Sequence, residues 1–462
     1  MKKKATLLGL SAACLGYLSL KWGGRFFFNK IFDSALKKIM TDLYDENIWE
    51  LVSATTRIGP QIIVETNLRA ERGELINRPL GSPKKFPSLD NLMFNIAQLD
   101  VLPTPLETPV DTSVIIGKEA KKPFKISLPM MVSAMAYGEA LSADAKWALA
   151  KGASIAKTAI CSGEGAFLRE ERKAADIYIY MYNRGDWNRD EEILKDCSGI
   201  EIQFGQGALG GVGHVLHAKT IDRQLRKALK YPKGKDAIVH SQQLNVQDAA
   251  ELPGFIENLK EISGGVPIGV KIAAGKYLEK DLEIACHAGA DYVVLDSAEA
   301  ATKGSPPILQ DDFGVPTVFA IPRGAEWLYK NGFQKSVSLI ASGKIRTPGE
   351  ALKALALGAD ACYIGSIALF AMTHDQVLKA LPYEPPTQVA WYNGKHSGQF
   401  NKKKAAQTLA KFFLSCKAEI EVGIKSLGKK NIREVNKNDL FSIDETIARG
   451  LKIPMAYEPP PQ

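Results

Sequence analysis

The chain has few cysteines, and none of them forms a metal-binding spacing. Its 462 residues include only six, and no two are arranged as CxxC. Structural zinc sites and local iron–sulfur clusters are built from closely spaced cysteines, so the sequence predicts no metal site. The histidines also lack an HExxH spacing. His240, near the end of an expected strand, is the one candidate for an active-site histidine, and a structural role is the favoured interpretation for it. The cysteines are Cys14, Cys161, Cys197, Cys286, Cys362 and Cys416.

Excess positive charge is scarce outside the N-terminus. The formal net charge is +8. Residues 1–40 hold eight Lys or Arg residues and a single Asp, which leaves a charge of about +1 for the rest of the chain. Nucleic-acid-binding proteins carry their basic residues on one face of a folded domain. The charge pattern therefore predicts no nucleic-acid partner.

Long apolar runs are absent except at the N-terminus, where residues 5–20 carry no charge. A helix of this run spans roughly 24 Å at about 1.5 Å per residue, whereas the bilayer core is about 30 Å thick. Lys21 would have to snorkel, with Trp22 at the interface. We expect residues 1–32 to form a single membrane anchor, with residues 5–32 at the membrane. A cleaved signal peptide and a buried or interfacial helix are the alternatives.

Four regions follow from the composition along the chain. Residues 33–127 are first helical and then rich in Pro and Gly, as in an extension that wraps a domain. Residues 128–381 alternate short apolar runs with helical patterns. Pro382, Pro385 and Pro386 end that rhythm, and residues 382–462 form an expected helical tail.

The alternating region predicts an α/β fold, a (β/α)8 TIM barrel. Eight apolar runs separated by helical stretches favour a closed parallel barrel over a doubly wound sheet. The helical stretches lie at 142–151, 246–262, 278–288, 319–331 and 347–357. The expected strands are residues 128–134, 154–160, 200–204, 237–240, 268–272, 292–295, 337–341 and 361–364.

Small residues follow the last two expected strands. Ser342 and Gly343 end one strand, and Gly365 and Ser366 end the next, where a helix begins. Barrel enzymes carry their sites at the carboxyl ends of the strands, and free N–H groups at a helix start attract phosphate. The pattern favours a phosphate site over two ordinary tight turns.

Two further features point to the same end of the barrel. Lys271 lies within an expected strand, where a lysine is costly unless it is paired or faces an anionic ligand; the alternative is a strand-end lysine that reaches solvent. The segment from Gly205 to Gly210 matches GxGxxG, but the glycines continue through Gly213 where a Rossmann helix would begin. We interpret it as a loop that covers a ligand.

At these positions the sequence resembles the central FMN-binding domain of glutamate synthase, over about residues 128–375. Residues 41–90 resemble a membrane-anchored single-domain subgroup of that family. The motifs are residues 133–138 with Leu141 and Ser142, residues 162–165, 206–208 and 270–272, Thr302 with residues 304–306, and the two strand ends described above.

The resemblance implies a flavin site and its substrate groups. Ser133, Ala134 and Met135 would line FMN, and Gln203 and Lys271 would contact its ring system. Ser342, Gly343, Gly365 and Ser366 would hold the phosphate. Glu164 and Gln206 would face the substrate, so Glu164, Gln206 and Lys271 are the expected catalytic residues.

The sequence also departs from this family in three places. No cysteine occurs in residues 370–386, where the family ligates an iron–sulfur cluster, so no cluster is expected. Leu209 stands where the family has a lysine for the 2-oxoglutarate carboxylate. Residues 298–302 replace a His-Asp-Gly-Gly-Thr segment.

The resemblance implies an FMN-dependent oxidoreductase of the glutamate synthase type. It would reduce an imine- or keto-type small molecule with electrons from a separate donor protein. Leu209, in place of the lysine that would bind the 2-oxoglutarate carboxylate, argues against true glutamate synthase activity. The alternative is a membrane-tethered, non-catalytic FMN-binding barrel that acts as an interaction module. A hydroxy-acid oxidase ranks last, because Lys344 and Arg346 have no neighbouring histidine base.

Overall fold

The computed structural model describes residues 2–47, 49–302, 304–379 and 386–459, with the backbone alone for residues 2–20, 386 and 387. The chain divides into two compact units, residues 1–76 and 77–462. The expected boundary between barrel and tail, at residues 381 and 382, lies outside the described residues. The other expected domain boundaries stay predictions.

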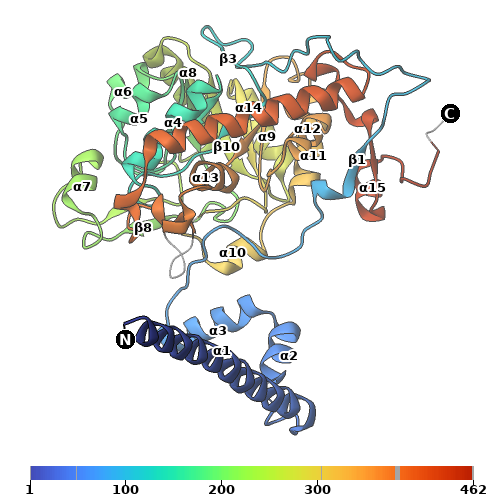
Figure 1. Cartoon of the computed structure of the whole chain (residues 1–462). Helices are drawn as coiled ribbons and strands as arrows, with labels where there is room; N and C mark the ends of the chain where they lie inside the picture. Colours follow the sequence, from blue (N-terminus) through green and yellow to red (C-terminus); the bar gives the residue numbers. More distant parts are fainter. Residues whose placement is uncertain (1, 48, 303, 380–385, 460–462) are drawn as a thin grey trace. The chain divides into compact units, whose positions relative to one another are not determined.

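The first unit consists of three helices, α1 (Lys2–Thr41), α2 (Trp49–Ile58) and α3 (Pro60–Arg72) (Figure 1). Asn47 shapes the turn after α1, because its side-chain amide donates to Ile39 O at 2.6 Å while its oxygen accepts from Trp49 N at 2.9 Å. Pro60 opens α3 at a position where the missing N–H is not needed. Gly73 closes α3 in the left-handed conformation.

The predicted membrane anchor and membrane localisation are wrong. Among the helices of the described residues, none combines the length and the apolar character that a bilayer crossing requires. The physical reason lies in α1 itself, where the uncharged run ends at Leu20 and Lys21 and Arg25 follow within the same helix. The apolar part is therefore shorter than a typical span.

The predicted barrel is confirmed in the second unit. Eight parallel strands close on themselves, and β13 pairs with β4 to complete the ring. Each strand is buried along nearly its whole length, as expected for strands covered by helices. In chain order the strands are β4 (Met130–Val132), β5 (Ala159–Cys161), β6 (Ile177–Tyr182), β7 (Gly199–Gln203), β10 (Ile268–Ala273), β11 (Tyr292–Asp296), β12 (Ser338–Ser342) and β13 (Ala361–Ile364).

Helices follow the strands around the barrel. Their starts carry the expected caps: the side chains of Ser142 and Thr347 accept from backbone N–H groups of the helices that they precede. The helices are α4 (Ala143–Ile155), α5 (Arg169–Ala174), α6 (Glu191–Lys195), α8 (Leu252–Ser263), α9 (Leu278–His287), α10 (Pro307–Asp311), α11 (Thr317–Lys330), α12 (Pro348–Ala356) and α13 (Ser366–Thr373).

The strand count was right, but one strand was assigned wrongly. Residues 237–240 do not enter the barrel, because β9 (Ala237–Val239) pairs antiparallel with β8 (His214–Leu216) in a hairpin that also carries α7 (Arg223–Leu229). The third barrel strand is instead β6, in which Tyr178, Tyr180 and Tyr182 alternate with aliphatic residues. Alternating aromatics in place of a continuous aliphatic run concealed this buried strand.

Segments before and after the barrel in the sequence cover the amino ends of its strands and part of its outer helical layer. The hairpin of β2 (Val114–Ile116) and β3 (Phe124–Ile126) lies at the amino ends of the strands, where Gly117 N donates to Ser338 Oγ at 3.4 Å. The long helix α14 (Lys402–Ser426) packs against α4, with Gly152 allowing the close approach of Leu409 (Figure 1). The strand β1 (Leu92–Phe94) pairs with β14 (Leu440–Ser442), which precedes α15 (Glu445–Leu451).

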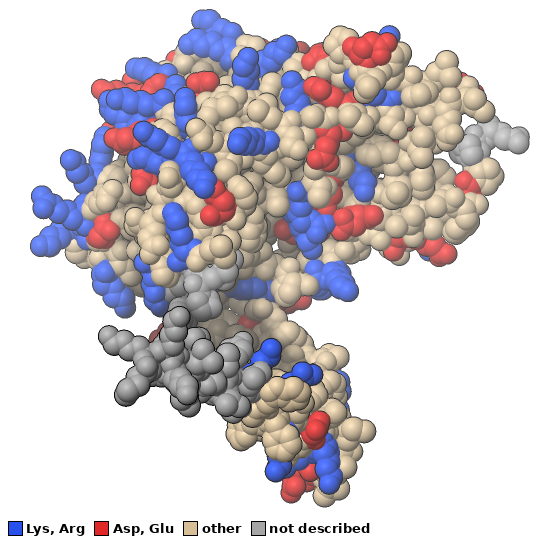
Figure 2. Space-filling model, in the orientation of Figure 1, with Lys and Arg blue, Asp and Glu red and all other residues tan. Residues whose placement is uncertain are grey.

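Acidic and basic side chains are interspersed on the barrel unit, and Lys and Arg side chains are frequent at the left of Figure 2, where Figure 1 shows α5, α6 and α7. With the amino ends of the strands covered by β2 and β3, the carboxyl ends are where side chains from many loops can meet a ligand.

Candidate active site

A cavity of about 660 Å³ opens at the carboxyl ends of the strands. Almost all of the site residues expected from the sequence line it together, although they come from six different strand ends. Gln203 is the exception, because it is fully buried at the end of β7. The lining residues among those expected are Ser133, Ala134, Met135, Glu164, Gln206, Lys271, Ser342, Gly343, Gly365 and Ser366. Their roles stay predictions, but their convergence is a property of the fold.

One end of the cavity is shaped by glycines after β12 and β13. Gly343 has φ +134°, and a Cβ there would overlap Ser297 Oγ and lie 2.8 Å from Thr317 Oγ1. A Cβ on Gly365 would lie 2.9 Å from Ser133 Oγ. The helix α13 begins at the next residue, so its first N–H groups, which lack carbonyl partners within the helix, face this end. The arrangement suits a phosphate group.

Two basic residues accompany these turns. Lys344 is exposed, lines the cavity and adopts φ +50°. Arg346 also lines the cavity, but its guanidinium donates to both oxygens of Asp90, at 2.9 and 2.8 Å, and to Glu350. Arg346 is therefore committed to carboxylates, and Lys344 is the cation better placed to attract a phosphate.

Lys271 occupies the floor of the cavity as part of a buried charge network. Its Nζ lies 3.4 Å from Oδ2 of Asp296, and both side chains are less than one-tenth exposed. Glu201 is fully buried beside it and accepts from Tyr363 Oη at 2.8 Å. Burial opposes the charge, but the carboxylates of Asp296 and Glu201 outweigh it and raise the pKa of Lys271. Lys271 is therefore a fixed positive charge, not a solvent-facing strand end.

Gln203 holds the two expected substrate-facing residues together. Its Nε2 donates to Glu164 Oε2 at 2.9 Å and to Gln206 Oε1 at 3.2 Å. Its own Oε1 is buried and has no hydrogen-bond partner among the described residues. A buried acceptor without a donor is costly, and because Gln203 does not line the cavity, a ligand would reach this atom only after neighbouring groups move.

The glycine-rich segment does not start a helix, which excludes a Rossmann arrangement. Gln206 and Gly210 exchange backbone hydrogen bonds at 3.0 and 2.7 Å, and the chain then enters the β8–β9 hairpin. Gly207 N donates to Asp296 Oδ2 at 3.1 Å, and a Cβ on Gly207 would overlap Ser297 O. The loop is thereby tied to β11, with Gln206 and Leu209 turned to the cavity.

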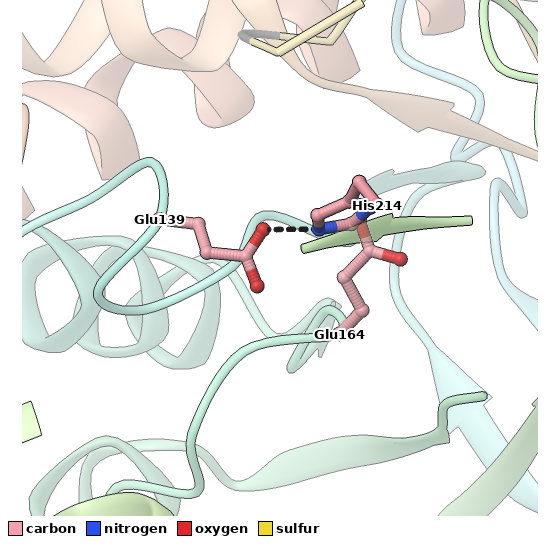
Figure 3. A group of neighbouring side chains, drawn as sticks. All are labelled: Glu139, Glu164 and His214. Atoms are coloured by element: carbon pink, nitrogen blue, oxygen red, sulfur yellow. Dashed lines mark hydrogen bonds and ion pairs between the residues drawn. The ribbon is translucent and has the colours of Figure 1, made fainter. Parts of the chain in front are cut away.

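The structure adds His214 and Glu139, which sequence reasoning missed. Nε2 of His214 lies 2.6 Å from Oε2 of Glu139, and both residues line the cavity near Glu164 (Figure 3). Burial works against the charged imidazole, but the hydrogen bond and the negative charges of Glu139 and Glu164 raise the pKa of His214 to about 9. His240, the expected histidine, follows Val239, the residue paired with His214 in the hairpin, and is not among the residues that line the cavity.

A buried lysine fixes the two loops that carry the residues expected to line the flavin and to face the substrate. Nζ of Lys146 donates to Met135 O at 2.6 Å and to Ser162 O at 2.7 Å, and it lies 2.9 Å from Glu171 Oε1. Lys146 and Glu171 are each about 1% exposed. Because one ammonium group satisfies two loop carbonyls and one carboxylate, the loops after β4 and β5 are held as one unit.

We expect stability to fall between pH 4.5 and 7 because of Glu171. Burial raises its pKa from 4.5 to about 7, against the attraction of Lys146. The folded chain therefore binds this proton more tightly than the unfolded chain, and it loses up to about 3 kcal/mol of unfolding free energy as the pH rises through that window. Urea unfolding at several pH values should show a flatter pH profile for Glu171→Gln. Equal slopes for the two proteins would contradict the assignment.

Comparisons with known proteins identify the family to which the chain belongs. Residues 82–430 match the family described as a conserved region in glutamate synthase. The chain is 29% identical over 413 residues to a glutamate synthase large subunit-like protein of Rhizobium meliloti, covering 85% of this chain and 93% of that protein. It is also 29% identical over 335 residues to an archaeal-type glutamate synthase [NADPH] of Thermotoga sp. strain RQ2, covering 68% of this chain and 66% of that relative.

A solved structure of mandelate oxidase with benzoyl-formic acid superimposes with a TM-score of 0.46 and 17% identity, covering 76% of this chain and 86% of that one.

The family match spans most of the barrel unit and includes every expected site residue. The chain therefore belongs to the glutamate synthase family and is an oxidoreductase of that family.

Proposed function

We propose that the chain is an FMN-dependent oxidoreductase that reduces an imine- or keto-type substrate with electrons from a separate donor. One observation carries this proposal: a single cavity joins the glycine-lined phosphate end, the buried charge of Lys271 and the Glu164–Gln206 pair. Its volume of about 660 Å³ falls in the range of sites for ligands of this size.

The residues present fit FMN. Gly343, Gly365 and Ser366 would hold the phosphate, with Lys344 contributing positive charge. Ser133, Ala134 and Met135, which line the cavity, would lie along the ring system. FMN when bound supplies hydride chemistry, and the protein supplies position and charge.

The chain's own residues would act on charge and orientation. Lys271, held charged by Asp296 and Glu201, stabilises negative charge that develops on a bound ring or substrate. Gln203 orients Glu164 and Gln206 toward the remaining space in the cavity. Leu209 and Ala300 add apolar surface that limits the water around the reacting groups.

The proposal is tested by reconstitution. The purified chain should bind one FMN and show the visible band of oxidised flavin. Anaerobic mixing of the reduced protein with a 2-oxo acid and ammonium should restore that band and form an amino acid. NADPH, named for the Thermotoga relative, is the first donor to try, with and without added carrier protein. A chain that stays colourless with added FMN would overturn the proposal. Flavin that binds but is reoxidised by no substrate would support the non-catalytic alternative.

Leu209 gives a direct test of substrate choice. It is 5% exposed and lines the cavity where the resemblance expects a lysine. We expect Leu209→Lys to bind 2-oxoglutarate roughly tenfold to a hundredfold more tightly, because a charge-assisted hydrogen bond contributes about 1.5–3 kcal/mol. The dissociation constant can be read from the perturbation of the flavin spectrum. Leu209→Met should bind like the parent, and equal affinity of all three proteins would refute a carboxylate site at this position.

A further inference from the structure

Three possible metal ligands converge at the mouth of the barrel from three separate loops. Glu139 follows β4, Glu164 follows β5, and His214 begins β8 after β7. One ligand atom of each residue lies within 4.8 Å of the others (Figure 3). Sequence spacing predicted no metal site, because these residues are brought together only by the closure of the barrel.

We propose that Glu139, Glu164 and His214 bind a divalent first-row transition-metal cation, such as Zn²⁺ or Mn²⁺. One imidazole and two carboxylates form a ligand set suited to these ions and less suited to Ca²⁺ or Mg²⁺, which prefer oxygen alone. Three protein ligands leave at least one coordination position open to the cavity that all three residues line.

Burial separates this cluster from ordinary acidic surface groups. The side chains of His214 and Glu139 are 27% and 18% exposed, and Glu164 as a residue is 8% exposed. A cation here would therefore be largely removed from bulk water, and the attraction of its ligands would be screened less than at the surface.

Outer contacts hold the three ligands in place. Gln203 Nε2 donates to Glu164 Oε2 at 2.9 Å. Lys146 ties the loops that precede Glu139 and Glu164 through Met135 O and Ser162 O. Arg184 is fully buried and donates to Gly211 O at 2.6 Å and Val212 O at 3.2 Å, just before His214. Such outer contacts orient the ligands of metal sites.

The competing explanation is a proton-bridged ion pair. In the structure Nε2 of His214 and Oε2 of Glu139 are hydrogen-bonded at 2.6 Å. A cation would take the place of the hydrogen on Nε2, so metal–nitrogen and metal–oxygen bonds would replace the hydrogen bond. The two explanations differ in one measurable property, the retention of a metal ion by the folded chain.

Metal binding would also bring positive charge into the cavity that Leu209 lines. A bound cation polarises a carbonyl or imine and attracts a carboxylate, which are tasks otherwise given to a basic side chain. This consequence rests on the proposed oxidoreductase function, whereas binding of the metal does not.

The test is a Mn²⁺ titration of the full chain, freed of any affinity tag and followed by the loss of the free Mn²⁺ electron paramagnetic resonance signal. We expect one ion per chain, displaced by Zn²⁺, with or without added FMN. Glu139→Gln and His214→Gln should each weaken binding by roughly tenfold or more. The matched control is His217→Gln, because His217 forms an exposed pair with Asp236 at 3.2 Å outside the cavity.

Near-ultraviolet circular dichroism should confirm that each variant is folded, and Glu139→Asp provides a milder change if Glu139→Gln is not. Absence of Mn²⁺ and Zn²⁺ binding would overturn the proposal in favour of the proton-bridged pair. Binding that persists in His214→Gln, or is lost in His217→Gln, would also overturn it. A chain that binds the metal but never FMN would retain this proposal and reject the flavin function.

Discussion

Replacing Lys271 by methionine is expected to lower the free energy of unfolding by about 3–5 kcal/mol, because the change leaves buried carboxylates without their cation. Asp296 lies 3.4 Å from Nζ of Lys271, and Glu201 is fully buried beside it. Burial already raises the pKa of Glu201, and without Lys271 this carboxyl should take up a proton more readily, so the loss should be smaller at pH 5 than at pH 8. Urea unfolding at the two pH values measures both effects.

The same variant also tests the role of Lys271 toward a bound flavin. Without its positive charge, the flavin midpoint potential should become more negative, and a purely structural lysine would not produce that shift. Lys276→Met removes an exposed lysine just beyond the same strand and should change stability by less than about 0.5 kcal/mol. Adding Glu201→Gln to Lys271→Met should recover part of the stability. An unchanged potential would contradict the assigned role.

Replacing Gly343 by alanine is expected to abolish tight FMN binding, with at least about a hundredfold loss of affinity. The residue has φ +134°, and its new Cβ would overlap Ser297 Oγ and lie 2.8 Å from Thr317 Oγ1. These two hydroxyls are hydrogen-bonded at 2.5 Å, and Thr317 Oγ1 also donates to Gly343 O at 2.9 Å. The turn would have to move to admit the methyl group, at a strain cost of about 1–3 kcal/mol.

Two further variants test whether distortion of the turn at Gly343 causes the loss of FMN affinity. Gly349→Ala adds a methyl group in the first turn of α12, where the nearest atom would be Thr347 Oγ1 at 3.8 Å, and it should bind FMN like the parent. Ser297→Ala combined with Gly343→Ala removes the overlapping Oγ and should restore part of the affinity. Fluorescence quenching of FMN on binding gives the dissociation constants. Full affinity in Gly343→Ala alone would remove the phosphate assignment from this turn.

The site residues that could be predicted from the sequence are those that their neighbours in the sequence are enough to identify. A lysine within an apolar strand can be recognised at Lys271 without knowledge of its partners. Likewise, Gly343 and Gly365 each indicate a tight turn directly after a strand. Because parallel strands of a closed barrel deliver all their carboxyl ends to one face, the fold class alone was enough to place these residues in one cavity.

The features that sequence reasoning missed depend on contacts between segments. His214 and Glu139 are 75 residues apart and belong to loops without regular spacing, so nothing local marks them as a pair. The hairpin of β8 and β9 was confused with a barrel strand because the short apolar run from Ala237 to Val239 has the same local pattern. Only its partner, an antiparallel strand instead of a parallel one, tells the two apart.

The pairing of β1 with β14 has a consequence for how the chain is made. Leu92 lies opposite Ser442, and the Ser442 hydroxyl donates to Asn91 O across 351 residues of sequence. During synthesis the segment around Leu92 leaves the ribosome long before its partner exists. It must remain an unpaired strand edge until residues 440–442 have emerged, so this pairing can form only after all eight barrel strands have been synthesised.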